Sequence, residues 1–478
     1  MKNPLSLPLR PLAALLLACC AARAADPGAA APVSERSAQL IQRLKMLRAK
    51  ENDFGPAYRA LYHAALPWYE LWGARDPKPV DAWMVSPEDY ADRLASALEK
   101  GRNFFAENPG ALFPLVFRRT LPGGTEFNVN YWLSLPPGFP AAGRSFPLII
   151  GLHGSGWIGH KISFKAGTGP GGPTFAVTPI DMDGPWQIDF LNAYLDELLA
   201  ILPVDPDRVY LEGHSLGAMA TWEWALNNPE RFAAISPRAG VGEPYRAVRL
   251  KNVPAWAIHG ENDTVIPYGF EEEMVSALQA QGAPVRFSIL KGGEHNMPED
   301  LDQQQVVDWY LRQTRSHLPT PPDPRAALGV GPSGFSRWDI VSQPQSSAWK
   351  SEPLAKLEQE QIRDAAQGLF RRAHDRGEVV DAQLMLELDP GAGTTTIWLP
   401  VPRPLHAGPR DPAAIVLPAA RFVRFYGKGI LGAREHLLAI QADLAAHGHV
   451  PTGPLWITPL SMWWTSPEGL YECRVQTN

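Results

Sequence analysis

The sequence predicts an α/β protein with a doubly wound, mostly parallel sheet, followed by an α+β domain of two strand-helix-strand-strand modules. Three observations lead to this fold class. Short apolar runs alternate with amphipathic helical segments from about residue 147 to residue 315. A stretch rich in proline and glycine, residues 317–335, ends the alternation and is expected to be a linker. Beyond it, the order strand, helix, strand, strand occurs twice.

The composition fits a large globular protein of several units. The 478 residues correspond to about three domains at the usual domain size. The 44 basic and 50 acidic side chains leave a net charge of −6, without long runs of either sign. Because no basic stripe follows the chain, we expect no nucleic-acid partner.

Residues 1–24 have the pattern of a secretory signal peptide. Two basic residues precede an apolar run over residues 12–22, which is too short to span a bilayer, and positions 22 and 24 hold the small residues of a cleavage site. We therefore expect export to the periplasm or secretion, and no transmembrane segment. The alternative is a lipid anchor, because residues 16–19 resemble a bacterial lipobox that would leave Cys19 as a lipidated N-terminus.

Residues 25–112 are expected to form a helical N-terminal region, since apolar residues recur there at spacings of three and four. Processing at residue 24 leaves Cys473 as the one cysteine, so an intrachain disulfide is excluded. No Cys/His cluster has zinc spacing, so we expect no metal site.

Residues 113–316 are expected to form the α/β domain. An antiparallel hairpin over residues 114–133 opens it, and strands and helices then alternate, which is typical of a parallel sheet covered on both faces. The predicted strands are residues 147–152, 174–179, 208–211, 232–236, 254–258 and 285–290.

A candidate nucleophile lies between one of these strands and the next helix. Residues 213–217 read Gly-His-Ser-Leu-Gly, the Gly-x-Ser-x-Gly pattern. Two glycines allow a sharp turn that lifts the hydroxyl of Ser215 above the sheet. The strand-turn-helix context distinguishes this motif from an ordinary tight turn.

A serine nucleophile needs a base, and the base needs an acid that orients it. Asp263 and His295 lie in loops just beyond two later strands, at the edge where doubly wound sheets place their sites. Glu261 is the alternative acid. His259 and His153 are the alternative bases, although each lies beside a glycine at a strand end, where a structural role is the better interpretation.

Backbone N–H groups that stabilise an oxyanion are expected at two positions. One is Leu216, directly after the nucleophile, and the other is Ser155, in the glycine-rich loop that follows the strand at 147–152. The loop lacks the Lys-Ser/Thr ending of a phosphate-binding loop, so we expect no nucleotide and no other cofactor.

Residues from about 126 to 315 resemble the α/β-hydrolase superfamily, in its secreted esterase and prolyl-oligopeptidase-like branch. The resemblance rests on the motifs at residues 147–156, 205–210, 213–217, 259–267 and 293–295. It implies hydrolysis of a carboxylic ester, on a small molecule or linked to a polysaccharide. The alternatives are a serine peptidase of the same branch and a catalytically silent binding protein. The oligopeptidase β-propeller is absent, which favours the esterase.

Substrate-binding residues are expected near the Gly-rich segment 157–173, a candidate lid. Trp157, Trp186 and His214 are the candidates, with ordinary packing as the alternative for each tryptophan.

Residues 336–478 resemble the gyrase-inhibitor-like small-molecule-binding domain of transcription regulators. The resemblance rests on residues 415–423, 427–429, 451–454 and 471–475. It implies a cleft for an amphipathic ligand around aromatic side chains and a buried acid, with Trp463, Trp464, Tyr471 and Glu472 as candidates. No helix-turn-helix accompanies the domain, and a packing domain without a ligand is the alternative.

Overall fold

The computed structural model describes residues 33–48, 50, 54–74, 86–108, 111–120, 126–136, 139, 144–154, 168–169, 172–173, 175–179, 186–296, 303–331, 334–355, 359–374, 376, 384–389, 393–401, 412–429, 434–460 and 469–477. The expected signal peptide and the lipobox cysteine lie outside these residues. Of the candidate lid, only residues 168–169 and 172–173 are described. No helix in the described part is long and apolar enough to cross a membrane.

Three α-helices make up the N-terminal region: α1 (Glu35–Leu47), α2 (Pro56–Trp68) and α3 (Pro87–Glu99). Side chains cap two of them, because Ser34 accepts a hydrogen bond from the N–H of Ser37 and Ser86 accepts one from Asp89. The buried residues of these helices belong to the same hydrophobic cluster as one face of the following sheet. The helical region therefore shares its core with the α/β domain.

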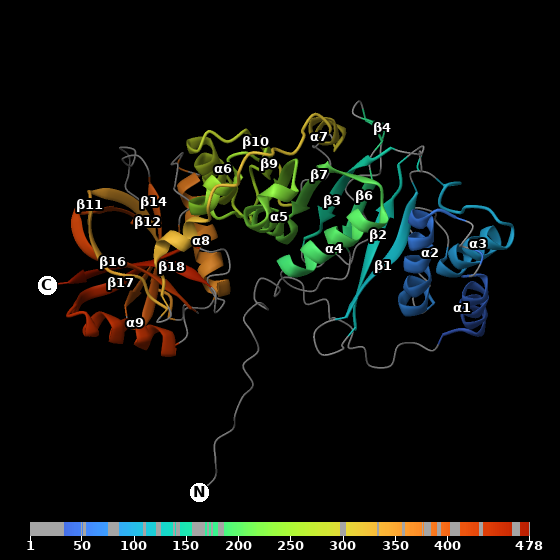
Figure 1. The fold of residues 1–478 in the computed structure, drawn as a ribbon. Helices are drawn as coiled ribbons and strands as arrows, with labels where there is room; N and C mark the ends of the chain where they lie inside the picture. Colours follow the sequence, from blue (N-terminus) through green and yellow to red (C-terminus); the bar gives the residue numbers. More distant parts are fainter. Residues whose placement is uncertain are drawn as a thin grey trace, which may run out of the picture.

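The α/β domain is built on an eight-stranded sheet in the order β1-β2-β6-β3-β7-β8-β9-β10 (Figure 1). The antiparallel hairpin lies at one edge, and every pair from β6 to β10 in sheet order is parallel. The mostly parallel sheet was expected from the sequence and is confirmed. The strands are β1 (Leu112–Thr120), β2 (Glu126–Ser134), β3 (Phe146–Leu152), β6 (Phe175–Pro179), β7 (Val204–His214), β8 (Ala234–Arg238), β9 (Ala255–Gly260) and β10 (Val285–Leu290).

Helices cover both faces of this sheet. Successive residues of β3 alternate between two hydrophobic clusters, with Leu148 and Ile150 in one and Ile149 in the other. The first cluster includes residues of α4 (Ile188–Ile201), α5 (Leu216–Asn227) and α6 (Gly269–Ala280), and the second includes residues of α7 (Gln303–Tyr310). Two short strands, β4 (Thr168–Gly169) and β5 (Gly172–Pro173), pair only with each other.

The C-terminal domain is a single eight-stranded antiparallel sheet in the order β11-β16-β18-β17-β13-β14-β12-β15. Both modules contribute, because the outer strands β11 and β15 each pair with a strand of the other module. The elements are β11 (Asp339–Gln343), β12 (Ser346–Lys350), α8 (Gln359–His374), β13 (Met385–Asp389), β14 (Thr394–Val401), β15 (Ala414–Leu417), β16 (Ala420–Lys428), α9 (Arg434–Ala446), β17 (Pro451–Pro459) and β18 (Leu470–Thr477).

The repeat was expected to be strand-helix-strand-strand, and this was wrong at its start. Each module begins with two strands before its helix. The segment 346–350, which contains two serines and a lysine, does not have an apolar strand pattern. In the second module, the segment before the helix divides at Pro418 into β15 and β16, because proline cannot donate a ladder hydrogen bond.

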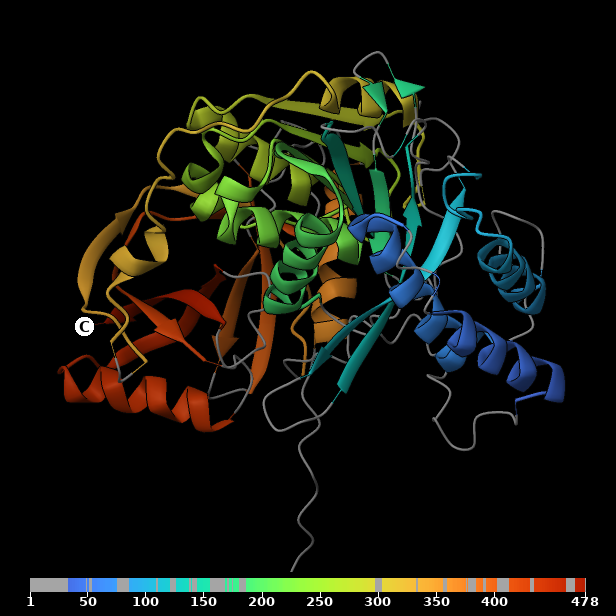
Figure 2. The ribbon, with the colours of Figure 1, turned by 45° about the vertical axis from the view of Figure 1, so that its right-hand side comes forward.

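The Pro/Gly-rich segment, residues 317–335, was expected to be a linker, and it makes hydrogen bonds to the α/β domain. Arg249 donates to the carbonyl oxygen of Pro321 over 2.8 Å, and Arg246 donates to Asp323 over 2.7 Å. Figures 1 and 2 both show the N-terminal helices and the C-terminal domain at opposite ends of the α/β domain. At the C-terminal side, Phe370 of α8 packs edge-on against Tyr268, with ring centroids 5.8 Å apart.

Candidate active site

Ser215 occupies a strained turn between β7 and α5. Its φ of 55° and ψ of −119° are rare for a residue with a side chain. The turn is fixed by the N–H of Ser215, which donates to the carbonyl oxygen of Arg238 over 2.9 Å. A Cβ on Gly213 would lie 2.1 Å from the carbonyl oxygen of Gly217, and a Cβ on Gly217 would lie 2.0 Å from that of Leu152. Close backbone approach therefore requires both glycines of the motif.

The structure brings Ser215, His295 and Asp263 together in one chain of hydrogen bonds. The Nε2 atom of His295 is 2.9 Å from Oγ of Ser215, and its Nδ1 atom is 2.7 Å from Oδ2 of Asp263. Because a carboxylate accepts, Nδ1 carries the proton and Nε2 accepts from the serine hydroxyl. The imidazole is thus held in the tautomer that can remove the serine proton.

Asp263 is buried and ionised. Its Oδ1 atom accepts from the N–H groups of Val265 and Ile266, each over 2.8 Å. Burial alone would raise the pKa of Asp263, but hydrogen bonds from His259 and His295 outweigh burial and hold the pKa well below its ordinary value. The carboxylate therefore stays charged across the neutral range.

The alternative residues lie elsewhere. Glu261 accepts from the N–H of Gly292 over 2.9 Å, at the exposed side of the loop. His259 is fully buried, and its Nε2 atom lies 3.2 Å from Oδ2 of Asp263, the same oxygen that His295 contacts. His153 directs Nδ1 to the carbonyl oxygen of Gly154, its own neighbour. The geometry favours Asp263 and His295 over these three.

His214 supports the base loop. Its Nε2 atom is 2.7 Å from the carbonyl oxygen of His295, to which it donates. Burial is the main cause that lowers the pKa of His214 to about 4, so the ring is neutral at pH 7. The sequence suggested His214 as a substrate-binding residue. In the structure its ring bonds to the loop that carries His295, a contact that the sequence pattern does not predict.

Trp186 is 3% exposed and lies behind the loop that follows β3. Its Nε1 atom donates to the carbonyl oxygen of His153 over 3.3 Å, and the centroids of the two rings are 4.9 Å apart. We interpret Trp186 as a support for this loop. Trp157, the other tryptophan proposed to bind substrate, lies outside the described residues.

One of the two expected oxyanion donors can be placed. Leu216 is the first residue of α5, where a backbone N–H has no partner within the helix. The dipole of the 12-residue helix favours negative charge at this end. Ser155 lies outside the described residues, and its neighbour Gly154 is buried, with an added Cβ 3.1 Å from Cβ of Ser215.

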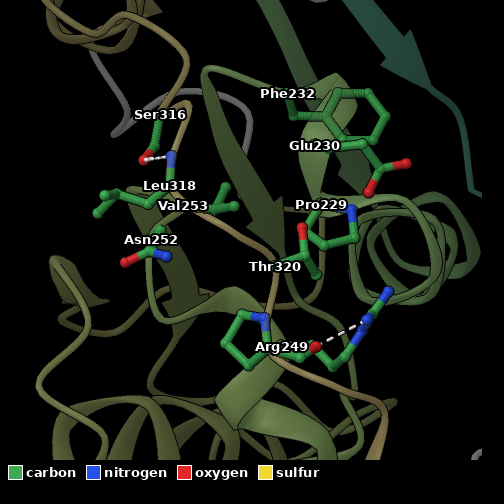
Figure 3. Close-up of a pocket in the computed structure, with 10 residues that line it drawn as sticks. Pro229, Glu230, Phe232, Arg249, Asn252, Val253, Ser316, Leu318 and Thr320 are labelled. Carbon is green, nitrogen blue, oxygen red and sulfur yellow. Dashed lines mark hydrogen bonds between the residues drawn. The ribbon is translucent and has the colours of Figure 1, made fainter.

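Figure 3 shows a pocket lined by residues of the α/β domain and of the segment that follows it. Phe232 precedes β8 and Val253 precedes β9, so this pocket lies at the amino ends of the strands, whereas Ser215 follows the carboxyl end of β7. Leu318, Thr320 and Pro321 of the Pro/Gly-rich segment also line this pocket. The pocket is therefore separate from the candidate active site.

Among the described residues, no group of three or more His, Cys, Asp or Glu side chains could hold a metal ion.

In the C-terminal domain, Tyr471 and Glu472 do not share a site. They are neighbours on β18, so their side chains point to opposite faces. Tyr471 is in the hydrophobic core and donates to or accepts from His436 over 2.8 Å, whereas Glu472 pairs with Arg474 over 2.6 Å on the other face. Their expected shared role was wrong for this reason. Trp463 and Trp464 lie outside the described residues.

Two other tryptophans meet on that other face, and the sequence analysis missed them. The ring centroids of Trp398 and Trp456 are 5.3 Å apart, and Nε1 of Trp398 donates to Glu387 over 2.7 Å. Their alternation along β14 and β17 with core residues was the available signal.

Comparisons with known proteins indicate similarity to esterases. Residues 187–307 match the sequence model of the phospholipase/carboxylesterase family. The esterase-named protein NocK of Nocardia uniformis subsp. tsuyamanensis is 30% identical over 158 residues, which are 29% of this chain and 46% of NocK. The bifunctional acetylxylan esterase/xylanase XynS20E of Neocallimastix patriciarum is 28% identical over 88 residues, 18% of this chain and 13% of that protein. The chain thus spans less than half the length of either relative.

Solved structures that match this chain include two esterases. A thermostable esterase is 25% identical with a TM-score of 0.37, covering 42% of this chain and 63% of that one. A feruloyl esterase module from Clostridium thermocellum is 14% identical with a TM-score of 0.34, covering 46% of this chain and 95% of the module. The family model covers residues 187–307, which contain Ser215, Asp263 and His295, and together with the esterase-named relatives it supports an α/β-hydrolase fold for this part of the chain.

Proposed function

We propose that the protein is a serine hydrolase that cleaves carboxylic esters through an acyl-enzyme on Ser215. The observation that supports this most is the continuous hydrogen-bond chain from Oγ of Ser215 through His295 to Asp263. The family similarity of residues 187–307 and the esterase names of both sequence relatives support ester as the substrate class.

The proposed reaction assigns each of these residues a step. His295 removes the proton of Ser215 through Nε2 as the hydroxyl oxygen attacks the ester carbonyl. The oxyanion accepts hydrogen bonds from the N–H of Leu216 and, in this proposal, from that of Ser155. His295 then protonates the leaving alcohol, and an activated water releases the acid from Ser215. Asp263 stays ionised and stabilises the imidazolium at each step.

The direct test is a substrate panel of p-nitrophenyl acetate, p-nitrophenyl butyrate, methyl ferulate, acetylated xylan and a peptide p-nitroanilide. We expect turnover of esters, and a fall of at least about 10⁴-fold in kcat for Ser215→Ala. Ser288→Ala is the matched control, because it removes a hydroxyl on β10 that accepts a hydrogen bond from Nε1 of Trp256 on the neighbouring strand β9. Equal ester turnover by Ser215→Ala and wild type would refute the nucleophile, and cleavage of the anilide alone would make the protein a peptidase.

For the C-terminal domain, an amphipathic ligand stays a prediction. What supports it is the pair Trp398 and Trp456 beside Glu387, with the ammonium of Lys350 5.7 Å from the Trp398 ring. Aromatic faces beside a carboxylate suit a flat ligand with a positive group. Export and the Cys19 anchor also stay predictions.

A further inference from the structure

A second histidine and a second carboxylate lie behind Asp263. His259, near the end of β9, and Glu271, in the first turn of α6, both have side chains with no exposed surface. Neither reaches Ser215 or His295 directly in the contacts described above. Two fully buried ionisable side chains are costly unless each is paired, so their arrangement requires an explanation.

Both ring nitrogens of His259 face hydrogen-bond acceptors. Nε2 is 2.7 Å from the carbonyl oxygen of Ile266 and 3.2 Å from Oδ2 of Asp263. A carbonyl oxygen can only accept, so Nε2 carries a proton. Nδ1 is 2.6 Å from Oε2 of Glu271. A second proton therefore lies between this nitrogen and the carboxyl group.

The charges around the ring favour the imidazolium. Burial alone would lower the pKa of His259, but the hydrogen bonds to Asp263 and Glu271 outweigh it and raise the pKa to about 9. Burial raises the pKa of Glu271, whereas its hydrogen bonds with His259 and with Nε1 of Trp222, 3.3 Å away, favour its ionised form. The titratable groups that face His259 in the described part are Asp263, from the loop after β9, and Glu271, from α6.

We propose that His259 is a positioning residue for the proposed hydrolysis: as a buried imidazolium between Glu271 and Asp263, it fixes the acid and weakens its hold on a protonated His295. The inference rests on the proposed function. Oδ2 of Asp263 is shared between the two histidines, 2.7 Å from Nδ1 of His295 and 3.2 Å from Nε2 of His259. A permanent positive charge on His259 at this oxygen reduces the stabilisation that the carboxylate can give to a positive charge on His295.

The consequence is a pH dependence that packing alone would not produce. The His259 imidazolium makes the protonated form of His295 less stable, so His295 stays unprotonated and able to act as a base at lower pH. If His259 loses its charge, His295 is protonated more easily. The acid limb of kcat/KM, which reports the base in the free enzyme, then moves to higher pH.

The test compares Glu271→Gln and His259→Gln with the control Met274→Ala. Met274 is a fully buried, nonpolar residue of the same helix, so its truncation destabilises the same region without touching a charge. We expect the acid limb of ester hydrolysis to move up by about one pH unit in both polar variants, and to stay in place in the control. Identical acid limbs in all three folded variants would overturn the proposal.

Nitrogen-15 NMR of wild-type protein labelled at histidine gives a second readout that needs no stable variant. We expect one histidine to be doubly protonated from pH 6 to pH 8, and its signal to disappear in His259→Gln or change in Glu271→Gln. A singly protonated His259 at pH 7 would refute the inference. Because NMR does not depend on turnover, it separates a failure of this inference from a failure of the proposed function, which Ser215→Ala tests.

Discussion

Asp263 connects the nucleophile system to the interior of the protein. Its two carboxylate oxygens have different partners, backbone N–H groups on Oδ1 and histidine nitrogens on Oδ2. An amide in its place would offer an N–H to one of these donors and leave it unpaired. We expect Asp263→Asn to lower kcat by about 10⁴-fold, because His295 loses its stable tautomer.

The matched control for this residue is Glu261→Gln, which changes the rival acid in the same loop. Glu261 accepts only an N–H contact from Gly292 among the bonds described, so we expect near-normal kcat. Steady-state kinetics on one ester decide between the two acids. Normal activity in Asp263→Asn together with loss in Glu261→Gln would reverse the assignment.

His259 also makes stability depend on pH. Its pKa is raised from 6.5 to about 9 in the folded protein, so the folded state binds its proton more tightly than the unfolded chain does. This contribution is fully present below about pH 6.5 and is lost as the pH rises through 9. Urea unfolding at pH 6, 7.5 and 9 should show a stability gap between wild type and His259→Gln that narrows toward pH 9. A gap that widens with pH would contradict this sign.

At the scale of elements, the turn between β7 and α5 depends on the close approach of three backbone segments. Gly217→Ala would place a methyl group 2.0 Å from the carbonyl oxygen of Leu152 on β3, so strand and helix must separate. We expect a loss of at least about 10²-fold in kcat, since small displacements of reacting groups have large effects on rate. Gly282→Ala, at a positive φ of 69° with open space around it, serves as a control for glycine replacement as such: stability falls but kcat does not.

The sequence predicted those elements whose pattern is local. The α/β strands, the helix after Ser215 and the loops that carry Asp263 and His295 follow from apolar periodicity and glycine positions. The role of His259 could not be predicted, because Glu271 reaches it only after α6 packs against β9. For the same reason, the side-by-side tryptophans of β14 and β17 were missed, since their strands are joined only through β13 and the sheet order is not encoded in spacing.

At the scale of the whole molecule, the Pro/Gly-rich segment ties the C-terminal domain to the α/β domain through a buried cation. Arg246 has 1% of its side chain exposed and bonds to Glu243 over 2.8 Å and to Asp323 over 2.7 Å. Composition alone predicted a linker, but the bonds of Arg246 and Arg249 attach this segment to the α/β domain. We call residues 317–335 the strap. The strap contacts the amino edge of the sheet, away from Ser215.

Removal of the strap contact should therefore lower stability without changing chemistry. We expect Asp323→Ala to lower the free energy of unfolding by about 2 kcal/mol, because a charged hydrogen bond to buried Arg246 is lost, and to leave kcat unchanged. Asp339→Ala, which breaks a more exposed pair with Arg424, should cost less than about 1 kcal/mol. Equal losses of unfolding free energy in the two variants, measured by urea unfolding, would show that the bond from Asp323 to Arg246 stabilises the protein no more than an exposed ion pair.

The central claim is that Ser215 is a nucleophile activated by His295 and Asp263. The most direct measurement is the intact mass of the protein after reaction with a fluorophosphonate, followed by identification of the labelled peptide. We predict one adduct per chain on Ser215, none in Ser215→Ala, and labelling slowed by about 10³-fold or more in Asp263→Asn. An adduct on another residue, or none on the folded wild-type protein, would contradict the account.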